Sequence, residues 1–331
     1  MTTKQTNNKI RLAYILAASH SGSTLLAMLL NSHPDICTVG ELKATSLGDP
    51  AKYRCSCQRL IRECPFWCGI RQDMAARGID FDVTSAGTDI RTGMSHYARR
   101  LLKPLCRNPF FETLRDTTLS LSSSWRHGLP TILARNRALI ECVAARSGAQ
   151  IIVDSSKIGI RLKYLLQMPE IDISVIRLVR DGRGVALTYV DPVRFADAQN
   201  PSLRGGGTGT NRDGERLSIT SAAREWRRSN EEAETLLARL PASQWTEVRY
   251  ENLCSHPHET LQQLVRFLGT DPDKVAIDFR TVKHHVVGNG MRLDSTNEIR
   301  LDERWRSELS PHDLAQFNSI AGNLLHQLGY Q

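Results

Sequence analysis

Residues Arg11–Glu41, RLAYILAASHSGSTLLAMLLNSHPDICTVGE, decide the fold of this chain. Leu12–Ala17 is a short apolar run typical of a buried strand, and Leu25–Leu30 is an apolar run suited to a helix. Small polar residues, Ser19–Thr24, lie between the two runs. A strand, a small-residue turn and a helix N-terminus together direct backbone N–H groups towards an anion. The stretch therefore predicts a binding site for a phosphate-like group.

The turn differs from the loop that binds nucleoside triphosphates with Mg²⁺. That loop has the form Gly-x-x-x-x-Gly-Lys-[Ser/Thr]. Aligned on Gly22, its first Gly is replaced by Ala17 and its Lys by Ser23. Gly22 would let the backbone approach a ligand closely, and Ser21, Ser23 and Thr24 add hydroxyl donors. The pattern favours a smaller phosphate group or one that needs no metal; the alternative is an ordinary strand-to-helix turn.

A second motif follows the apolar strand predicted for Ile173–Val179. Arg180 stands at the end of that strand, and Thr188 lies eight residues later, about two turns into the next helix. A guanidinium fork and a hydroxyl suit a phosphate monoester. The alternative for Arg180 is a surface ion pair with Asp181.

Apolar strands alternate with helical segments along most of the chain, which predicts a three-layer α/β fold around a parallel sheet. We expect one domain over residues 1–331, with a core of about 10–42 and 129–292. A weakly patterned, largely helical insertion that would shape the acceptor site occupies about 43–128. A glycine-rich stretch at about 197–215 predicts a flexible loop or lid. Further strands are predicted at 36–39, 151–153 and 246–250, and Ser155 or Ser156 could cap a helix after the second of these. Further helices are predicted at 130–147, 221–240, 259–268 and 311–328.

Composition limits the class of protein. The chain has 331 residues and a formal net charge of +8, which suits an anionic ligand. Lys and Arg are scattered, without a basic tail or finger motif, so nucleic acid is not expected as a partner. No apolar run reaches the length of a membrane span or signal peptide, which predicts a soluble, cytoplasmic protein. The sequence leaves the oligomeric state open.

Four of the eight cysteines cluster in the insertion, at Cys55, Cys57, Cys64 and Cys68. Their spacing permits a zinc site but contains no pair of Cys-x-x-Cys motifs. The alternatives are a metal site or buried and free thiols, since disulfides are not expected in a reducing compartment.

Together these motifs resemble sulfotransferases that use 3′-phosphoadenosine 5′-phosphosulfate (PAPS), of the bacterial and carbohydrate type. The turn is similar to that family's basic-Ser-Gly-[Ser/Thr]-[Ser/Thr] loop, with His20 in the basic position. The second motif is similar to Arg-Asp-Pro-Arg followed by a Ser, with Gly182 for the Pro and Thr188 for the Ser. Two further blocks resemble family motifs, 248–269 and 285–292.

The resemblance implies a P-loop type fold and transfer of a sulfuryl group from PAPS, without a required metal, to a small-molecule or glycan acceptor. The acceptor group would be a hydroxyl or amine of a carbohydrate, lipid or natural product. Two other classes remain open: a small-molecule kinase that uses ATP and Mg²⁺, and a catalytically silent nucleotide-binding module.

The resemblance also implies roles for individual residues. Glu41 would be the general base, and His20, in the family's basic position, would contact the bridging oxygen. From their own positions in the chain, His33 is a weaker rival base or a helix-end residue, and Lys157, just after a strand end, would supply the missing positive charge at the leaving group. With His20 in place of Arg or Lys, activity would depend on pH. Residues implied to bind the donor are Ser21, Gly22, Ser23 and Thr24 at the 5′ end, Arg180, Thr188 and Arg292 at the 3′-phosphate, and Tyr250 near the adenine. Structural alternatives are core packing for Tyr250 and solvent exposure for Glu41, Lys157 and Arg292.

Overall fold

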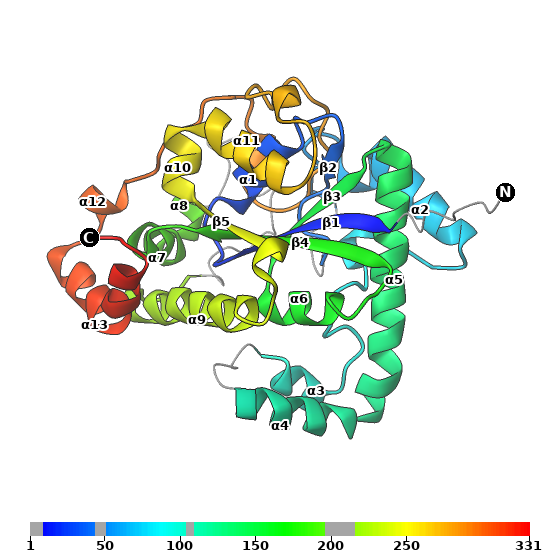
Figure 1. The fold of residues 1–331 in the computed structure, drawn as a ribbon, viewed down its shortest axis with the longest axis horizontal. Coiled ribbons are helices and arrows are strands. Elements are labelled where there is room, and N and C mark those ends of the chain that lie inside the picture. The colour runs from blue at the N-terminus through cyan, green and yellow to red at the C-terminus, as the bar shows by residue number, and fades with distance from the viewer. Residues whose placement is uncertain (1–8, 44–50, 104–108, 196–215) are drawn as a thin grey trace.

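A five-stranded parallel sheet forms the centre of the protein, in the strand order β2-β3-β1-β4-β5 (Figure 1). The computed structural model describes residues 9–43, 51–103, 109–195 and 216–331. All five strands lie where the apolar runs predict them. Their bounds are Ile10–Ala17 (β1), Ile36–Thr38 (β2), Ile151–Lys157 (β3), Ile171–Val179 (β4) and Trp245–Arg249 (β5).

Helices cover both faces of the sheet, which confirms the predicted three-layer architecture (Figure 1). Successive side chains of β1 point to opposite faces, as the two-residue period of a strand requires. Leu12, Tyr14 and Leu16 pack with α5 (Ser123–Ser147), α6 (Gly159–Leu165) and α9 (Ile219–Leu237). Ala13, Ile15 and Ala17 pack with α1 (Ser23–Leu30), α10 (Tyr250–Ser255) and α11 (Pro257–Phe267).

A third cluster of apolar side chains lies beyond the end of β4. It joins α7 (Gly182–Val190) and α12 (Trp305–Glu308) to α9 and α13 (Pro311–Gln327). Gly182 lies at its centre, where an added Cβ would stand 2.6 Å from Phe317 and 2.7 Å from Trp226. This position therefore has no room for a side chain, which gives a physical reason for glycine in the second motif.

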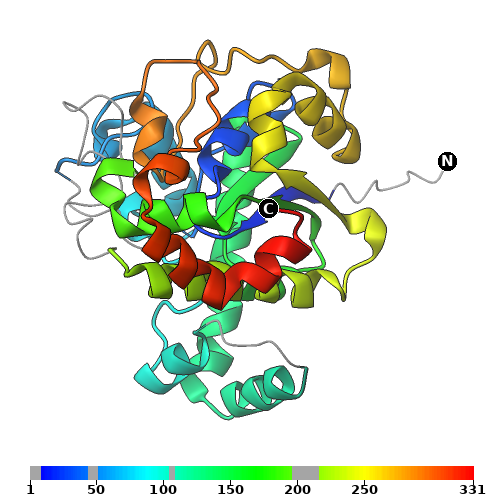
Figure 2. The same ribbon diagram turned by 90° about the vertical axis from the view of Figure 1, so that its left-hand side faces the viewer.

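The insertion is helical: its α3 and α4 form a lobe on the α6–α9 side of the sheet, whereas its α2 packs against α5 (Figures 1 and 2). It contains α2 (Pro65–Ala76), α3 (His96–Leu101) and α4 (Pro109–Ser120), and its apolar cluster continues onto α6 through Ile160 and Tyr164. Within the described residues, the remaining short elements are α8 (Pro192–Phe195) and the 3₁₀ turns Ile61–Glu63, Val83–Ser85, Ala242–Gln244, Pro272–Lys274 and Gly290–Leu293.

Three details differ from the sequence-based expectations or lie beyond the structure. Helix α5 begins at Ser123, before the predicted start of the core, and includes Pro130. Strand β3 continues to Lys157, so Ser155 and Ser156 are strand residues and the prediction that one of them caps a helix is wrong. The N-cap of α6 is instead Ile158. The loop predicted at 197–215 lies outside the described residues.

No helix among the residues placed in the structure is long and apolar enough to cross a bilayer.

Candidate active site

Every strand of the sheet delivers a site residue to the same edge. Because the strands are parallel, their carboxyl ends meet where open α/β sheets bind ligands. Strands lie ~4.8 Å apart, so the five strand ends span about 19 Å. In order across the sheet, the residues are Glu41 after β2, Lys157 at the end of β3, Ser21–Thr24 after β1, Arg180 after β4 and Tyr250 after β5.

The turn after β1 has the features of an anion site. Gly22 adopts a left-handed conformation (φ 88°) as the N-cap of α1, and no described side chain caps that helix. The N-terminal N–H groups of a helix attract anions when no side chain satisfies them. The Ser21 hydroxyl is buried without a hydrogen-bond partner among the described residues. An unsatisfied buried hydroxyl costs about 1–3 kcal/mol, so the turn fits a bound oxyanion that would satisfy it.

Tyr250 forms one wall of this turn. A Cβ added to Gly22 would stand 2.5 Å from the Tyr250 ring, so the ring fills the space that glycine leaves. The Arg180 guanidinium lies over the same ring, 4.4 Å from its centroid. Tyr250 is thus buried between the turn and Arg180, and burial raises the pKa of its phenol above the ordinary value.

Arg180 is buried and links three segments of the chain. Its Nη1 donates to the carbonyl oxygen of His20 (2.8 Å), and its Nη2 donates to the Asp302 carboxylate (3.0 Å). The alternative of a surface ion pair with Asp181 is wrong, because Asp181 pairs with Arg183 (2.7 Å). Asp302 had no signal in the sequence that marked it as a site residue.

Asp302 is ionised beside Arg180. Burial alone would raise the pKa of this carboxyl, but hydrogen bonds and charge from Arg304 and Arg180 outweigh burial and lower the pKa to about 2. The guanidinium of Arg180 is therefore held by a carboxylate, a group with the charge sign of a phosphate.

Thr188 lies on the side of α7 that faces Arg180. A Cβ added to Gly184 would stand 3.2 Å from Arg180 Nη2, and residues four apart share one face of a helix. The Thr188 hydroxyl is buried and donates to the carbonyl oxygen of Gly184 (3.1 Å). Its lone pairs and its place one turn beyond Gly184 are compatible with the implied role.

His20 and Lys157 share an uncommon backbone conformation. Their φ angles are 63° and 70°, in the left-handed region that disfavours residues other than glycine. Such strain costs of order 1–3 kcal/mol and is concentrated at functional sites. The His20 ring makes an edge contact with the ring of Tyr189, with 4.6 Å between centroids. The two residues expected to supply positive charge are therefore both held in strained positions.

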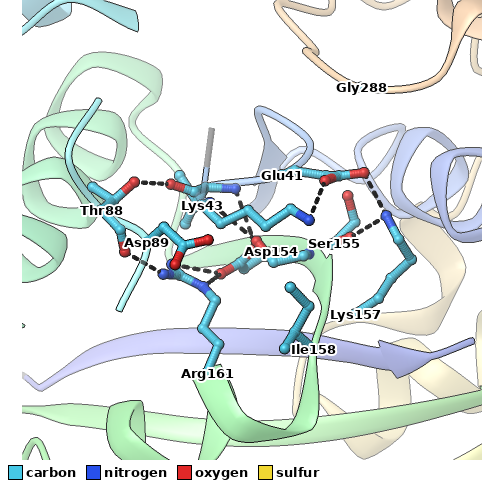
Figure 3. A network of polar contacts seen from close by, with 12 residues as sticks. Glu41, Lys43, Thr88, Asp89, Asp154, Ser155, Lys157, Ile158, Arg161 and Gly288 are labelled. Atoms are coloured by element: carbon cyan, nitrogen blue, oxygen red, sulfur yellow. Dashed lines mark hydrogen bonds and ion pairs between the residues drawn. The ribbon is translucent and has the colours of Figure 1, made fainter. Parts of the chain in front are cut away.

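Glu41 lies between two lysines (Figure 3). Lys157 Nζ donates to its Oε1, and Lys43 Nζ lies 3.5 Å from its Oε2. Burial would raise the pKa of Glu41, but the two ammonium groups outweigh it and lower the pKa to about 2. Glu41 is 23% exposed and Lys157 11%, so neither is the solvent-exposed side chain of the alternative interpretation.

A buried ion pair that sequence reasoning missed supports Glu41 and Lys157 (Figure 3). Arg161 Nη2 donates to Asp154 Oδ2 (3.1 Å), and both side chains are almost fully buried. Asp154 Oδ1 accepts the backbone N–H groups of Leu42 (3.2 Å) and Ser156 (2.9 Å). The pair thereby fixes the residue after Glu41 and the residue before Lys157.

Arg292 is buried, so the alternative of a solvated arginine is wrong. It donates to the carbonyl oxygens of Gly288 (2.6 Å) and Arg54 (2.6 Å), and it lies over the Tyr53 ring, 4.5 Å from the centroid. Gly288 faces Glu41, whose Oε1 would be 3.9 Å from a Cβ added there. These contacts place Arg292 on the side of the site near Glu41, and a contact with a 3′-phosphate stays a prediction.

His33 is fully buried and structural. Its Nε2 bonds to the carbonyl oxygen of Asp271 (2.8 Å), and its Nδ1 accepts the N–H of Asp35 (3.1 Å). Both ring nitrogens are therefore occupied at the end of α1, which leaves Glu41 as the candidate base.

Comparisons with known proteins give one consistent family. A model described as "Sulfotransferase family" matches residues 136–274. Carbohydrate sulfotransferase 1 of Danio rerio is 23% identical over 339 residues, which cover 96% of this chain and 77% of that protein. Carbohydrate sulfotransferase 6 of Homo sapiens is 22% identical over 331 residues, covering 96% and 80%. Among solved structures, the sulfotransferase domain from the curacin biosynthetic pathway shares the fold, with a TM-score of 0.50 and 18% identity over 96% of this chain and 97% of that chain.

Proposed function

We propose that this chain, which belongs to the sulfotransferase family, transfers a sulfuryl group from PAPS to a hydroxyl or amine of an acceptor molecule. The resemblance to carbohydrate sulfotransferases favours a carbohydrate acceptor, and a lipid or natural-product hydroxyl belongs to the same chemical class. The observation that carries the proposal is the order of groups along the sheet edge: carboxylate, ammonium, anion turn, guanidinium and aromatic ring.

The donor side of the site fits a doubly phosphorylated adenosine. The turn at Ser21–Thr24 offers helix N–H groups and the unsatisfied Ser21 hydroxyl for the 5′ end. Arg180 and Thr188 would hold the 3′-phosphate, and Tyr250 between the two anion sites would pack near the adenine. Ser23 replaces the lysine that binds terminal phosphates in nucleoside triphosphatases, which supports transfer without a metal ion.

On the acceptor side, Glu41 would accept the proton of the attacking hydroxyl. As the new bond from the acceptor oxygen to sulfur forms, the bond from sulfur to the bridging oxygen breaks, and its electron pair stays on the 5′-phosphate. A carboxylate with a pKa of about 2 is ionised at neutral pH but is a weak base while Lys157 and Lys43 neutralise it.

Lys157 connects the two halves of the reaction. Negative charge develops at the leaving oxygen, and an ammonium that moves from Glu41 towards that charge would strengthen Glu41 as a base at the same moment. His20, in the basic position of the turn, would add positive charge there as an imidazolium. The strained backbone of both residues supports a functional reason for their placement.

Ligand-induced stabilisation tests the proposal. We expect 3′-phosphoadenosine 5′-phosphate (PAP) to raise the melting temperature without added Mg²⁺, and ATP with Mg²⁺ to raise it much less. Transfer of labelled sulfate from PAPS to a panel of sugars would then identify the acceptor. Stabilisation by Mg-ATP alone would support a kinase instead.

A further inference from the structure

A cluster of three thiols and one imidazole lies outside the residues assigned to sulfuryl transfer. Cys55, Cys57 and Cys64 come from the insertion, and His285 comes from a loop 221 residues beyond Cys64. We propose that these four side chains bind one zinc ion, which ties the insertion to the 285–292 loop beside Glu41.

The distances between the four ligand atoms suit a tetrahedral ion. All four lie within 4.8 Å of one another. Cys57 Sγ is 3.6 Å from Cys64 Sγ, and His285 Nδ1 is 3.3 Å from Cys64 Sγ and 3.9 Å from Cys55 Sγ. Zn–S bonds of about 2.3 Å and Zn–N bonds of about 2.05 Å at tetrahedral angles give S···S edges of about 3.8 Å and S···N edges of about 3.6 Å. The cluster needs only small shifts to accept zinc.

The same distances argue against a disulfide. A disulfide joins two sulfurs at about 2.05 Å, and all three cysteines are free thiols here. Cys55 and Cys64 are fully buried, and Cys57 and His285 are partly buried. Three thiols and an imidazole that face one another within a largely dry site form the donor set that zinc prefers, with thiolates excluding the hard cations.

The backbone around each ligand is fixed. Cys55 and Cys57 stand in a tight turn, where the Cys55 N–H donates to Arg59 (3.0 Å) and the Gln58 N–H donates to Cys55 (2.8 Å). Cys64 is the N-cap of α2, directly before Pro65 at its first turn.

Two aromatic residues of α2 hold His285. The Phe66 ring stacks on the imidazole with 4.7 Å between centroids and 5° between planes. Trp67 Nε1 donates to the carbonyl oxygen of His285 (3.1 Å). The imidazole therefore presents Nδ1 to the thiols in a fixed orientation.

The position of the cluster indicates a structural role. Four protein ligands complete a tetrahedral zinc site and leave no open position for catalysis. The loop after His285 is bonded to the insertion, through Val286 N to Ser56 Oγ (2.8 Å) and Gly288 N to the Tyr53 hydroxyl (2.9 Å). Val287 N donates to Val39 (2.9 Å), two residues before Glu41. A zinc ion would thus lock together the segments that surround the candidate base.

Metal analysis of the full chain tests the proposal independently of any activity. Protein purified without chelators is expected to hold one zinc per chain. Replacement by Co²⁺ should give the thiolate charge-transfer band and the strong visible bands of a tetrahedral site. Removing zinc should lower the melting temperature, and zinc addition should restore it.

Variants locate the ion. Cys57→Ser and His285→Ala should each lower zinc content at least tenfold under dialysis. Cys68→Ser is the matched control: Cys68 belongs to the same sequence cluster, but its thiol donates to the carbonyl oxygen of Arg62 (3.1 Å), so zinc content should stay at one.

If a variant fails to fold, the zinc site can still be tested on the wild-type protein. Titration with a mercurial should release zinc in step with modification of three thiols. A wild-type protein that binds no zinc after incubation with it, that holds iron instead, or whose Cys68→Ser variant loses the metal would overturn the assignment.

Discussion

The ammonium of Lys157 donates to the carboxylate of Glu41, although 116 residues separate the two in the sequence. They meet because β2 and β3 are neighbouring parallel strands whose carboxyl ends lie at one edge of the sheet. The ion pair keeps Glu41 ionised and Lys157 placed between the candidate base and the anion turn. In the proposed mechanism, Lys157 therefore has to move away from Glu41 before Glu41 can act as an effective base.

Glu41→Gln should separate binding from chemistry. The amide keeps the size of the side chain but accepts no proton, so turnover should fall about 10²–10⁴-fold while the affinity for PAP stays within about twofold. Steady-state rates with PAPS and calorimetric titration with PAP measure the two effects. Glu63→Gln changes an exposed carboxylate of the insertion and should leave both unchanged. A normal rate in Glu41→Gln would exclude Glu41 as the base.

The same ion pair predicts a change in stability with pH. The pKa of Glu41 falls from 4.5 when unfolded to about 2 when folded, so the carboxylate favours the folded state. Its contribution is complete above about pH 5, is lost as the pH falls towards 2, and amounts to at most about 3 kcal/mol. Lys157→Met keeps the side-chain length and the left-handed backbone. Denaturant unfolding at pH 7 and pH 3.5 should show a smaller acid-induced loss in this variant than in the wild type. Equal losses would contradict the assignment.

Arg180→Ala should weaken PAP binding by about 10- to 100-fold, because it removes a charge-assisted fork from the 3′-phosphate. The control ligand is adenosine 5′-phosphate, which lacks the 3′-phosphate. Its affinity for the Arg180→Ala variant should therefore be close to its affinity for the wild type. Arg183→Ala is the matched control from the same motif, since Arg183 stacks on Trp305 (3.9 Å) and pairs with Asp181. Undiminished PAP affinity in Arg180→Ala would place the 3′-phosphate elsewhere.

Arg161→Met should destabilise the fold by about 3–5 kcal/mol, because it leaves the buried Asp154 carboxylate without its partner. The double variant Arg161→Met with Asp154→Asn removes the unpaired charge and should recover part of the loss. Urea unfolding measures both variants. A single variant as stable as the wild type would show that the pair does not support this part of the site.

Gly182→Ala should cost about 1–3 kcal/mol, since its Cβ would overlap Trp226 and Phe317. Gly322→Ala is a control for which the expected change in stability has the opposite sign. Gly322 lies inside α13, and a Cβ there would meet only Asn318 at an ordinary 3.6 Å. This substitution should stabilise the protein by about 0.5–1 kcal/mol. Thermal unfolding of the two variants would shift in opposite directions, and two shifts of the same sign would refute the packing argument.

The sequence predicts those features that are determined by residues close together in the chain. Each strand is a local apolar run, and the turn at Ser21–Thr24 and the motif beginning at Arg180 follow two of these runs directly. Their alternation with helices sufficed for the fold class. Glu41 and Lys157 were expected at the site from the resemblance and from the strand before Lys157, and the structure brings both to the edge where the parallel strands end.

Contacts between distant segments were not predictable in this way. Asp302 reaches Arg180 across 122 residues, and its own surroundings in the sequence are an ordinary charged stretch. Arg161 and Asp154 are near each other in the sequence, but the capping pattern of Asp-Ser-Ser concealed a strand that continues through three buried polar residues. The cysteine spacing gave no complete metal motif because the fourth ligand, His285, lies 230 residues from Cys55. Location in the cytoplasm and the identity of the acceptor stay predictions.

The strand order has a consequence for how the chain is made. β1 is made before the other four strands of this sheet, yet both of its partners come from the second half of the sheet's sequence. β1 ends at Ala17 and β3 begins at Ile151. At translation rates of about 5–20 residues per second, roughly 7 to 27 s therefore pass between the synthesis of β1 and the synthesis of the first strand that pairs with it. During synthesis both edges of the future central strand are exposed to wrong partners, and protection of this nascent segment by chaperones would govern the yield of active enzyme.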